Sequence, residues 1–350
     1  MSDFADAGKQ GCNVMTDFSS AGSSPAGPAV SVVMPLYNKE ATVRRAVESV
    51  LSQTVTDFEL IIVNDGSTDR GPDIARTFDD GRIRIIDQPN AGVSSARNRG
   101  IHEAETDLIA FIDADDEWEK DFLETIVSLR QTYPHCGVYG TSYFLCRPGH
   151  TRQAVLKGMP GAFVSGVLSD YFLVAAYSDP PLCSSAVAVT RDAITGAGGF
   201  PENVSTGEDL LTWARLASRY DIAYTVVPKS SFWMPLKISD RPGRFPQMPD
   251  RVGDGLMALK QEHPSARMKG LRDYIALWHR MRAVLYMHLG ERVNAVNELR
   301  KAFHACGGLK VCMLYAVAIM PARLSAGLLS AMHAGRESFR EHSSDGRSAR

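Results

Sequence analysis

No run of apolar residues in the sequence approaches the roughly 18 that a membrane-spanning helix needs. The apolar segment 311–320 is too short and is ended by Pro321. The first 28 residues also lack the basic start and the apolar core of a signal peptide, and their small, polar composition predicts a disordered leader. We therefore expect a cytoplasmic protein.

The chain also has little net charge and no paired cysteines at a metal-binding spacing. Its 38 basic and 40 acidic side chains give a formal net charge of −2, so there is no electrostatic reason to expect a nucleic-acid partner. The six cysteines are scattered, which is typical of reduced intracellular thiols and not of zinc ligands. A chain of 350 residues can form one sizeable α/β domain plus a smaller appendage.

Three carboxylates follow an apolar strand in the run Phe111-Ile112-Asp113-Ala114-Asp115-Asp116. Open α/β sheets bind ligands at the carboxyl ends of their strands. Asp113 and Asp115 are separated by one residue, so both can face the same side of an extended segment. Such oxygen ligands suit Mg²⁺ or Mn²⁺, which usually complete their coordination with substrate phosphates. The run predicts a metal-assisted nucleotide site. The alternative is a polar loop that caps a helix beginning near Glu119.

Three further segments precede this run in the sequence, and their order matters for the interpretation. They are Val30–Glu40, a buried strand with a turn and a helix start; Phe58–Asp69, a strand that ends in Asn64-Asp65-Gly66; and Gln88–Gly100, a glycine-containing turn that opens a helix. Together with the acidic run, they closely resemble the nucleotide half of a family 2 glycosyltransferase. The resemblance covers Val30 to Pro228.

The resemblance implies a GT-A fold, which is a Rossmann-like α/β architecture. We expect a mixed, mostly parallel sheet flanked by helices, with a C-terminal α-helical appendage. The expected domains are a leader over 1–28, a glycosyltransferase domain over 29–240 and a helical region over 241–350. The Pro-rich stretch 242–246 is the linker candidate.

The resemblance also implies how a nucleotide sugar is bound. Asp65 would accept the imide N–H of uracil, with Pro35 and Tyr37 beside the base, and Arg97 would contact the diphosphate near the start of its helix. For each there is a structural alternative. Asp65 can close an Asx turn, Tyr37 can be a packing aromatic, and Arg97 can pair with a surface carboxylate.

The metal site is assigned by the same resemblance. Asp115 would bind Mn²⁺ or Mg²⁺, and Asp113 would touch either the ribose or the metal. The ion would then stabilise the diphosphate as a leaving group. Asp116 is expected to orient the loop from behind. Many relatives carry a histidine after the base helix, but residues 226–235 contain none, so the third protein ligand stays open.

A second acidic pair, Glu208-Asp209, precedes residues 210–217, whose apolar spacing is helical. In the first turn, the helix dipole keeps a carboxylate ionised. The pair resembles the family's Glu-Asp motif, whose aspartate is the general base, and Gly198–Glu202 is similar to the acceptor-side loop. This predicts Asp209 as the base, with Glu208 on the acceptor side. The alternative is an ordinary helix-terminal acid. A base and a metal-bound leaving group fit a single displacement with inversion.

The C-terminal region is predicted to be helical. Apolar residues at helical spacing predict one helix over Leu271–Leu285 and a second with Val296, Leu299, Phe303 and Cys306 on one face. The segment 309–340 combines apolar residues with arginines. It can lie on a membrane surface as a peripheral contact or form a buried helical hairpin. Both interpretations remain open at this stage.

The sequence thus predicts a metal-dependent, inverting transferase that moves a sugar, with UDP as the expected carrier, onto a glycan or lipid-linked acceptor in surface or secreted glycan synthesis. The Gln-x-x-Arg-Trp motif of processive synthases is absent, so we expect one sugar per encounter. Two rivals are a non-catalytic nucleotide-sugar-binding protein and a membrane-docked scaffold. A third, a sugar-nucleotide nucleotidyltransferase, would need a glycine-rich basic loop after the first strand, and Met34–Asn38 is not one.

Overall fold

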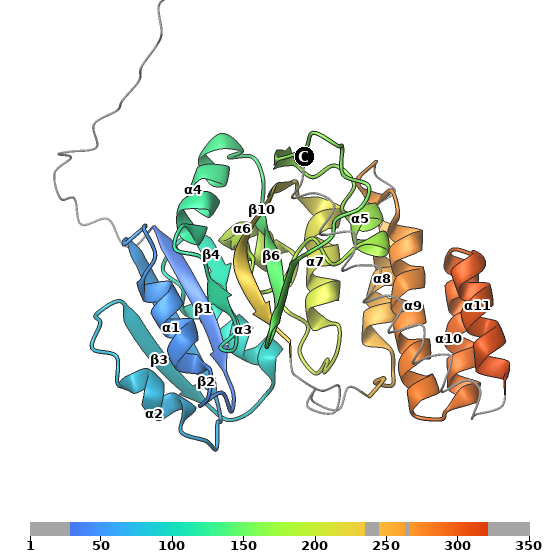
Figure 1. Ribbon diagram of the computed structural model, residues 1–350, viewed down its shortest axis with the longest axis horizontal. Coiled ribbons are helices and arrows are strands. Elements are labelled where there is room, and N and C mark those ends of the chain that lie inside the picture. Colours follow the sequence, from blue (N-terminus) through green and yellow to red (C-terminus); the bar gives the residue numbers. More distant parts are fainter. Residues whose placement is uncertain (1–28, 235–244, 263–265, 321–350) are drawn as a thin grey trace, which may run out of the picture.

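The computed structural model describes residues 29–234, 245–262 and 266–320 (Figure 1). The predicted leader 1–28, most of the linker candidate and the tail 321–350 lie outside these ranges. A twisted sheet with helices on both sides occupies one end of the molecule, and a row of helices occupies the other (Figure 1). This arrangement confirms the predicted α/β sheet with C-terminal helices.

The first third of the chain forms the parallel half of the sheet. Its elements in chain order are β1 (Val30–Leu36), α1 (Val43–Leu51), β2 (Phe58–Asp65), α2 (Gly71–Arg76), β3 (Ile83–Gln88), α3 (Val93–Glu103) and β4 (Leu108–Phe111). The strands lie in the order β3-β2-β1-β4 and are all parallel. β1 and β2 are buried almost throughout because helices cover both of their faces, which explains their nearly continuous apolar sequences.

Alternate side chains of these strands enter two separate cores. Val33 of β1 lies in the core that contains Ala96 of α3, and Val32 lies in the core that contains Val47 of α1. Gly100 lets α3 approach β1 closely, since a Cβ at this position would lie 2.3 Å from a methyl carbon of Val33. The helix that carries Arg97 is therefore seated directly on the central strand.

The second part of the sheet is mixed. Its elements are β5 (Glu117–Trp118), α4 (Phe122–Thr132), β6 (Val138–Arg147), β7 (His150–Gln153), β8 (Ser165–Val167), α5 (Tyr171–Tyr177), β9 (Val187–Thr190), α6 (Arg191–Gly196), α7 (Glu208–Arg219) and β10 (Ile222–Trp233). The order continues as β4-β9-β6-β10-β5. β9 runs antiparallel between β4 and β6, whereas β6 and β10 are parallel. Strands β1, β2, β3, β4, β6 and β10 thus share one direction, as the mostly parallel prediction requires.

The helix expected near Glu119 begins three residues later, at Phe122. Residues 117 and 118 instead form β5, which pairs with β10 in an antiparallel manner. The acidic run is therefore followed by a strand and not directly by a helix. The helix-cap alternative for Asp113 and Asp115 is removed, because α4 is capped at Asp121.

The C-terminal helices are α8 (Arg251–Glu262), α9 (Leu271–His288), α10 (Arg292–Ala305) and α11 (Leu309–Ile319), with a short 3₁₀ turn at Ala266–Met268. They lie side by side beyond α7 (Figure 1). The sheet's buried core continues through α7 into α8 and α9, where Leu256 and Tyr274 belong to the same apolar cluster as Trp213. The helices at 271–285 and around 296–306 are confirmed. The apolar face predicted for the second of these helices is partly wrong, because Phe303 is exposed and α10 packs through Leu299 and Ala302.

α11 has one buried and one exposed side. Val311, Leu314 and Ala318 pack with Leu299 of α10 in a small separate core. Leu309, Met313 and Ile319 are exposed. Within the described residues, no helix is both long and apolar enough to cross a membrane.

Candidate active site

The strand ends of the parallel half gather the residues that the sequence singled out. The β1 and β2 register pairs Leu36 with Asn64, so Tyr37 and Asp65 follow neighbouring positions. The β1 and β4 register pairs Val33 with Phe111, which places Asp113 two residues beyond β4 at the same edge. Because parallel strands end on one side of the sheet, a single edge collects the first, second and fourth of the predicted motifs.

Asp65 is buried and its carboxylate is held by the segment that opens α3. Oδ1 accepts hydrogen bonds from Gln88 Nε2 (2.8 Å) and Ala91 N (2.9 Å), and Oδ2 accepts one from Gly92 N (2.9 Å). The Asx turn that was the alternative is made by its neighbour, since Ser67 N donates to Asn64 Oδ1. A carboxylate accepts about four hydrogen bonds. Asp65 therefore keeps one acceptor position on Oδ2 beyond those used in the fold.

Tyr37 is half-exposed at the end of β1, and Pro35 is partly buried two residues before it. The loop that follows is fixed from the β2 side. Asn38 N donates to Ser67 Oγ, and Thr68 N donates to Asn38 Oδ1. With 47% of its surface exposed, Tyr37 is not a core packing residue.

The acidic run has two accessible carboxylates and one buried carboxylate. The side chains of Asp113 and Asp115 are 26% and 35% exposed. Asp116 is buried and accepts hydrogen bonds from Ser185 Oγ (2.5 Å) and Trp233 N (2.9 Å). Burial, reinforced by the charges of Asp113 and Asp115, raises the pKa of Asp116 well above its usual value. Asp116 thus ties the acidic run to Ser185 and to the backbone of β10.

Two basic side chains pair with the accessible carboxylates. Lys39 Nζ lies 2.5 Å from Asp115 Oδ2, and Arg97 donates from Nη2 to Asp113 Oδ1 (2.7 Å). Arg45 adds a hydrogen bond to the backbone carbonyl of Asp115. Neither Lys39 nor Arg45 was among the predicted site residues. The position of Lys39, just past the first strand at the same sheet edge, is the signal that would have found it.

Arg97 connects the acidic run to the second acidic pair. Its side chain is only 4% exposed, and its Nη1 lies 3.7 Å from Glu208 Oε1. Burial alone lowers the pKa of Arg97, but the charges of Asp113, Glu208 and Asp209 outweigh burial and raise it. Arg97 therefore does form ion pairs, but its partners are carboxylates of the site and not a surface carboxylate.

Glu208 and Asp209 occupy the first turn of α7, as predicted. Gly207 precedes them with a φ of +82°, a conformation that favours glycine. Asp209 is half-buried, and its Oδ1 accepts a hydrogen bond from Leu210 N (2.7 Å). Asp209 lies close enough to Arg97 for its charge to help raise the pKa of that guanidinium.

Asn98 holds the loop that resembles the acceptor-side loop. Its Nδ2 donates to the carbonyl of Phe200 (2.9 Å), and its Oδ1 accepts from Phe200 N (2.8 Å). α3 thus presents Arg97 to the carboxylates and Asn98 to the 198–202 loop. No residue-specific role was predicted for Asn98, because its partner lies 102 positions away in the sequence.

The segment that forms this edge of the sheet is similar to known proteins. Residues 31–158 match the family described as Glycosyl transferase family 2. The part of the chain that holds the parallel strands and the acidic run is therefore similar to this family. Over 102 residues, it is 44% identical to the uncharacterized glycosyltransferase YibD of Escherichia coli strain K12, a match that covers 29% of this chain and 30% of YibD. The chain spans about a third or less of the length of the curated relatives it matches.

Two solved structures show that the fold extends beyond the family 2 segment. A crystal structure of S. aureus TarS in complex with UDP-GlcNAc has a TM-score of 0.61 and 18% identity, covering 90% of this chain and 92% of that one. A mannosyltransferase from Pyrobaculum calidifontis, solved with GDP-Man and Mn²⁺, has a TM-score of 0.54 and 18% identity, covering 87% and 85%. The predicted GT-A fold is confirmed.

The carboxylates at the sheet edge fit a divalent metal ion. Asp113 and Asp115 offer oxygen ligands that are reachable from solvent, which Mg²⁺ and Mn²⁺ prefer. Of the segment 226–235, where many relatives carry a histidine, Trp233 contacts the acidic run by donating a hydrogen bond from its backbone N to Asp116. The third protein ligand to the metal is therefore still unassigned.

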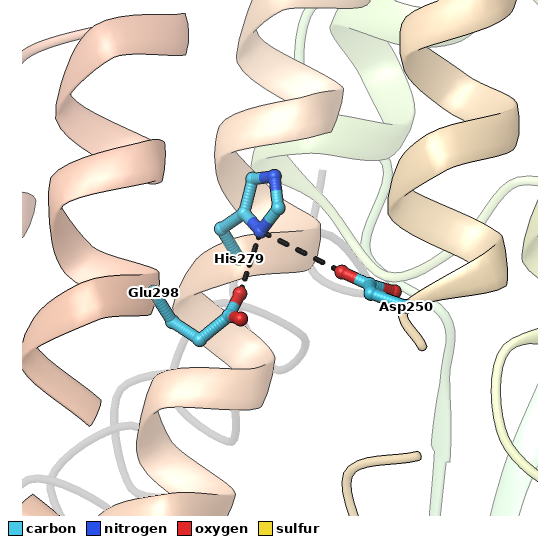
Figure 2. A group of neighbouring side chains, drawn as sticks. All are labelled: Asp250, His279 and Glu298. Carbon is cyan, nitrogen blue, oxygen red and sulfur yellow. Dashed lines mark hydrogen bonds and ion pairs between the residues drawn. The ribbon is translucent and has the colours of Figure 1, made fainter. Parts of the chain in front are cut away.

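A second group of potential ligands lies elsewhere, between the C-terminal helices (Figure 2). His279 Nδ1 is 2.7 Å from Glu298 Oε2 and 4.0 Å from Asp250 Oδ2. All three residues are buried, but a cation already lies among them. Arg282 Nε is 3.3 Å from Asp250 and 3.4 Å from Glu298. We conclude that a guanidinium fills this position, so the group is a charge network and not a metal site.

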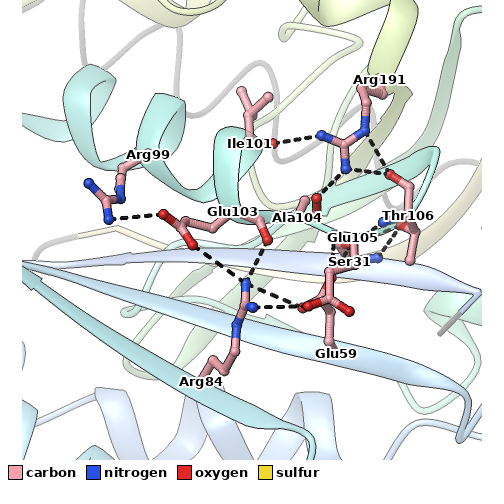
Figure 3. Close-up of polar contacts among 10 residues, drawn as sticks. All are labelled: Ser31, Glu59, Arg84, Arg99, Ile101, Glu103, Ala104, Glu105, Thr106 and Arg191. Carbon is pink, nitrogen blue, oxygen red and sulfur yellow. Dashed lines mark hydrogen bonds and ion pairs between the residues drawn. The ribbon is translucent and has the colours of Figure 1, made fainter. Parts of the chain in front are cut away.

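A third polar network anchors the far end of α3 at the opposite edge of the sheet (Figure 3). Arg191 donates to the carbonyls of Ile101, Ala104 and Thr106. Arg84 pairs with Glu59, with Glu103 at the end of α3 and with Glu105 just beyond it. The last carbonyls of a helix lack internal partners, so Arg191 acts as a cap. α3 is therefore fixed at both ends, which holds Arg97 and Asn98 in place.

Proposed function

We propose that this protein is a glycosyltransferase that moves a sugar from a UDP-linked donor to an acceptor hydroxyl with inversion. The observation that carries the proposal is the position of Arg97. It joins the accessible carboxylate Asp113, at the end of β4, to the acidic pair at the start of α7. A donor site and a general base on the two sides of one buried cation are what a single displacement needs.

The donor side is formed by the strand ends. Asp65 retains an acceptor position for the N–H of a base, and Tyr37 offers an exposed ring beside Pro35. Asp115 and Asp113 would hold Mn²⁺ or Mg²⁺, which when bound supplies Lewis-acid stabilisation of the diphosphate leaving group. Nε and Nη1 of Arg97 have no hydrogen-bond partner among the described residues, and diphosphate oxygens would satisfy them.

The acceptor side is formed by α7 and the 198–202 loop. Asp209 would remove the proton from the acceptor hydroxyl, and the helix N-terminus favours the ionised carboxylate that does so. Glu208 would keep Arg97 in place through its ion pair. With Asp209 as base and no covalent nucleophile, the attacking oxygen displaces the diphosphate directly, and the anomeric configuration inverts.

The wider role completes the proposal. A family 2 domain without the processive motif is suited to adding one sugar per encounter to a glycan or lipid-linked acceptor of a surface or secreted polysaccharide. The exposed side of α11 supports peripheral contact with the cytoplasmic face of a membrane through residues 309–340, of which 309–320 are described. A binding protein without catalysis, and a membrane-docked scaffold, are the competing functions.

The test is a donor screen. The purified protein is incubated with Mn²⁺ and a panel of UDP-, GDP- and other nucleotide sugars, with and without glycan and lipid-linked acceptors, and the release of free nucleoside diphosphate is measured. We expect Mn²⁺-dependent release from a UDP-sugar that an acceptor accelerates. Tight binding of a nucleotide sugar without release under any condition would favour the binding protein instead.

A further inference from the structure

The loop that leads into α7 rests on the C-terminal helices. Trp278 of α9 is buried directly beneath Gly207. A Cβ added to Gly207 would lie 2.6 Å from Cζ3 of the indole ring. Gly207 is the residue before Glu208 and Asp209, so the ring supports the backbone from which both acids extend. The positive φ of Gly207 is a second reason for glycine at this position, because any other residue would have a strained backbone as well as a clash with the ring.

A second contact fixes the same loop from the side. The amide of Gln247 donates from Nε2 to the carbonyl of Asn203 (2.8 Å) and accepts from Ser205 N (3.2 Å). The backbone carbonyl of Gln247 in turn accepts from Arg282 Nη1 (3.1 Å). Residues 203–207 are thus held from below by α9 and from the side by the segment that precedes α8.

A buried charge network sets the position of both supports. Trp278 Nε1 donates to the two oxygens of Asp250 (3.1 and 3.2 Å), and Arg282 Nε lies 3.3 Å from the same carboxylate. Glu298 of α10 holds Arg282 from the other side, at 3.4 Å from its Nε. The same carboxylate of Glu298 also contacts His279 Nδ1 (Figure 2). Burial works against the ionised form of Glu298, but His279, Lys301 and Arg282 outweigh it and lower its pKa to about 2.

Stability alone is a weak reason for such a network. Replacing buried ion pairs with apolar residues of similar volume is often neutral or stabilising. What the network provides is geometry, because each member has a partner that fixes its direction. A third contact reaches the first turn of α7 itself, where Tyr274 OH of α9 donates to the carbonyl of Leu210 (3.2 Å).

We infer that Trp278 and Gln247, held by Asp250 and Arg282, are positioning residues for the 203–207 loop and for the carboxylate of Asp209. The C-terminal helices thereby set the geometry of the acceptor side. This inference rests on the proposed function, in which Asp209 is the base. None of the positioning residues contacts the donor site, so their effect should appear in transfer and not in donor binding.

The main variant is Trp278→Ala, and its conservative partner is Trp278→Phe, which keeps a ring beneath Gly207 but loses the hydrogen bond to Asp250. Leu299→Ala is the matched control, because Leu299 is a buried residue of the C-terminal helices that does not touch the loop. A displacement of about 1 Å at a reacting group costs up to about 10²-fold in rate. We expect Trp278→Ala to lower kcat for transfer by about that factor, with UDP affinity within about twofold of the parent.

Rescue separates positioning from a general structural role. Trp278→Phe should recover most of kcat, and Leu299→Ala should lower thermal stability while the folded fraction keeps its kcat. A folded Trp278→Ala protein with kcat within about twofold of the parent overturns the inference. The inference is also overturned if Leu299→Ala lowers kcat as much as Trp278→Ala does. If Trp278→Ala does not fold, Gln247→Ala replaces it, since Gln247 is only partly buried, and an unchanged kcat in that variant also overturns the inference.

A measurement without substrate distinguishes failure of this inference from failure of the proposed function. Amide hydrogen exchange over residues 203–211 should accelerate in Trp278→Ala and Gln247→Ala, and not in Leu299→Ala. Faster exchange in a protein that transfers no sugar would leave the positioning intact and refute the function. Unchanged exchange refutes the positioning whatever the activity.

Discussion

Two acidic clusters in this protein have similar residues and opposite character. At the sheet edge, four carboxylates (Asp113, Asp115, Glu208 and Asp209) face two basic side chains, Lys39 and Arg97. Between the C-terminal helices, the two carboxylates of Asp250 and Glu298 face Arg282 and Lys301, with His279 beside them. Negative charge is in excess at the first cluster and balanced at the second. Only the first cluster has an excess of negative charge that a divalent cation would offset.

Solvent access separates the clusters in the same way. Asp115 is 35% exposed, whereas Glu298 is 4% exposed at its side chain. Solvent can reach the edge cluster, but the inner cluster is closed and internally paired. The comparison teaches that proximity of acids does not identify a metal site. The number of resident cations and the access to solvent decide it.

The largest effect should come from the edge cluster. Asp209→Asn preserves the shape and the helix start, since asparagine also suits the start of a helix. Transfer should fall by about 10²- to 10⁴-fold, the usual worth of a positioned base, while donor binding stays unchanged. The measurement is kcat with acceptor at saturating donor, beside a melting curve. Asp209→Asn is compared with Glu208→Gln, which should instead weaken donor binding, because Glu208 is assigned to hold Arg97. If Asp209→Asn melts like the parent and still transfers within a few-fold, Asp209 is only a helix-terminal charge.

The clusters should differ next in metal dependence. Asp115→Ala should abolish the Mn²⁺-dependent part of UDP binding, exceeding the roughly 10- to 100-fold loss that follows removal of a supporting residue. Glu298→Gln should leave that binding unchanged, because its cluster holds Arg282 in place of a metal. Calorimetry with UDP in the presence and absence of Mn²⁺ measures both. Equal UDP affinity of Asp115→Ala and the parent in Mn²⁺ would remove the metal assignment.

The inner cluster should control acid stability. The pKa of Glu298 is lowered from 4.5 to about 2 in the folded protein, so the native state favours its ionised form. Its contribution is present above pH 4.5 and lost as the pH falls towards 2. Glu298→Gln should remove on the order of 3 kcal/mol at neutral pH and flatten the pH dependence of unfolding over that window. Urea denaturation at several pH values tests this, and an unchanged slope would contradict it.

The smallest effect should be at the surface, away from both clusters. The double variant Met313→Ser and Ile319→Ser removes apolar area from the exposed side of α11 without touching its packed side. We expect binding to anionic vesicles to weaken by a few-fold, since interfacial helices bind through buried apolar area, and donor turnover to stay unchanged. Flotation with vesicles containing anionic lipid is the measurement. Equal flotation of both forms would show that this surface does not bind membranes.

The sequence revealed the edge cluster because of local order. Asp65 and Asp113 each come directly after a buried apolar run, and strand ends of this kind meet at one edge. The inner cluster escaped prediction because His279, Arg282 and Glu298 are polar residues on helices, where the solvent-facing side is the usual place for them. Lys39, Asn98 and Ser185 were missed for another reason. Their partners lie 76, 102 and 69 positions away in the sequence.

The place of β9 has a consequence for how the chain is made. Strands β3, β2, β1 and β4 are complete once residue 111 has been synthesised, so the parallel half can form its sheet early. β6 follows at residues 138–147, but the strand that joins it to β4 is β9, at 187–190. Until β9 leaves the ribosome, β4 keeps an open, apolar edge. A nascent chain arrested between these points should bind chaperones more strongly than one arrested after residue 233.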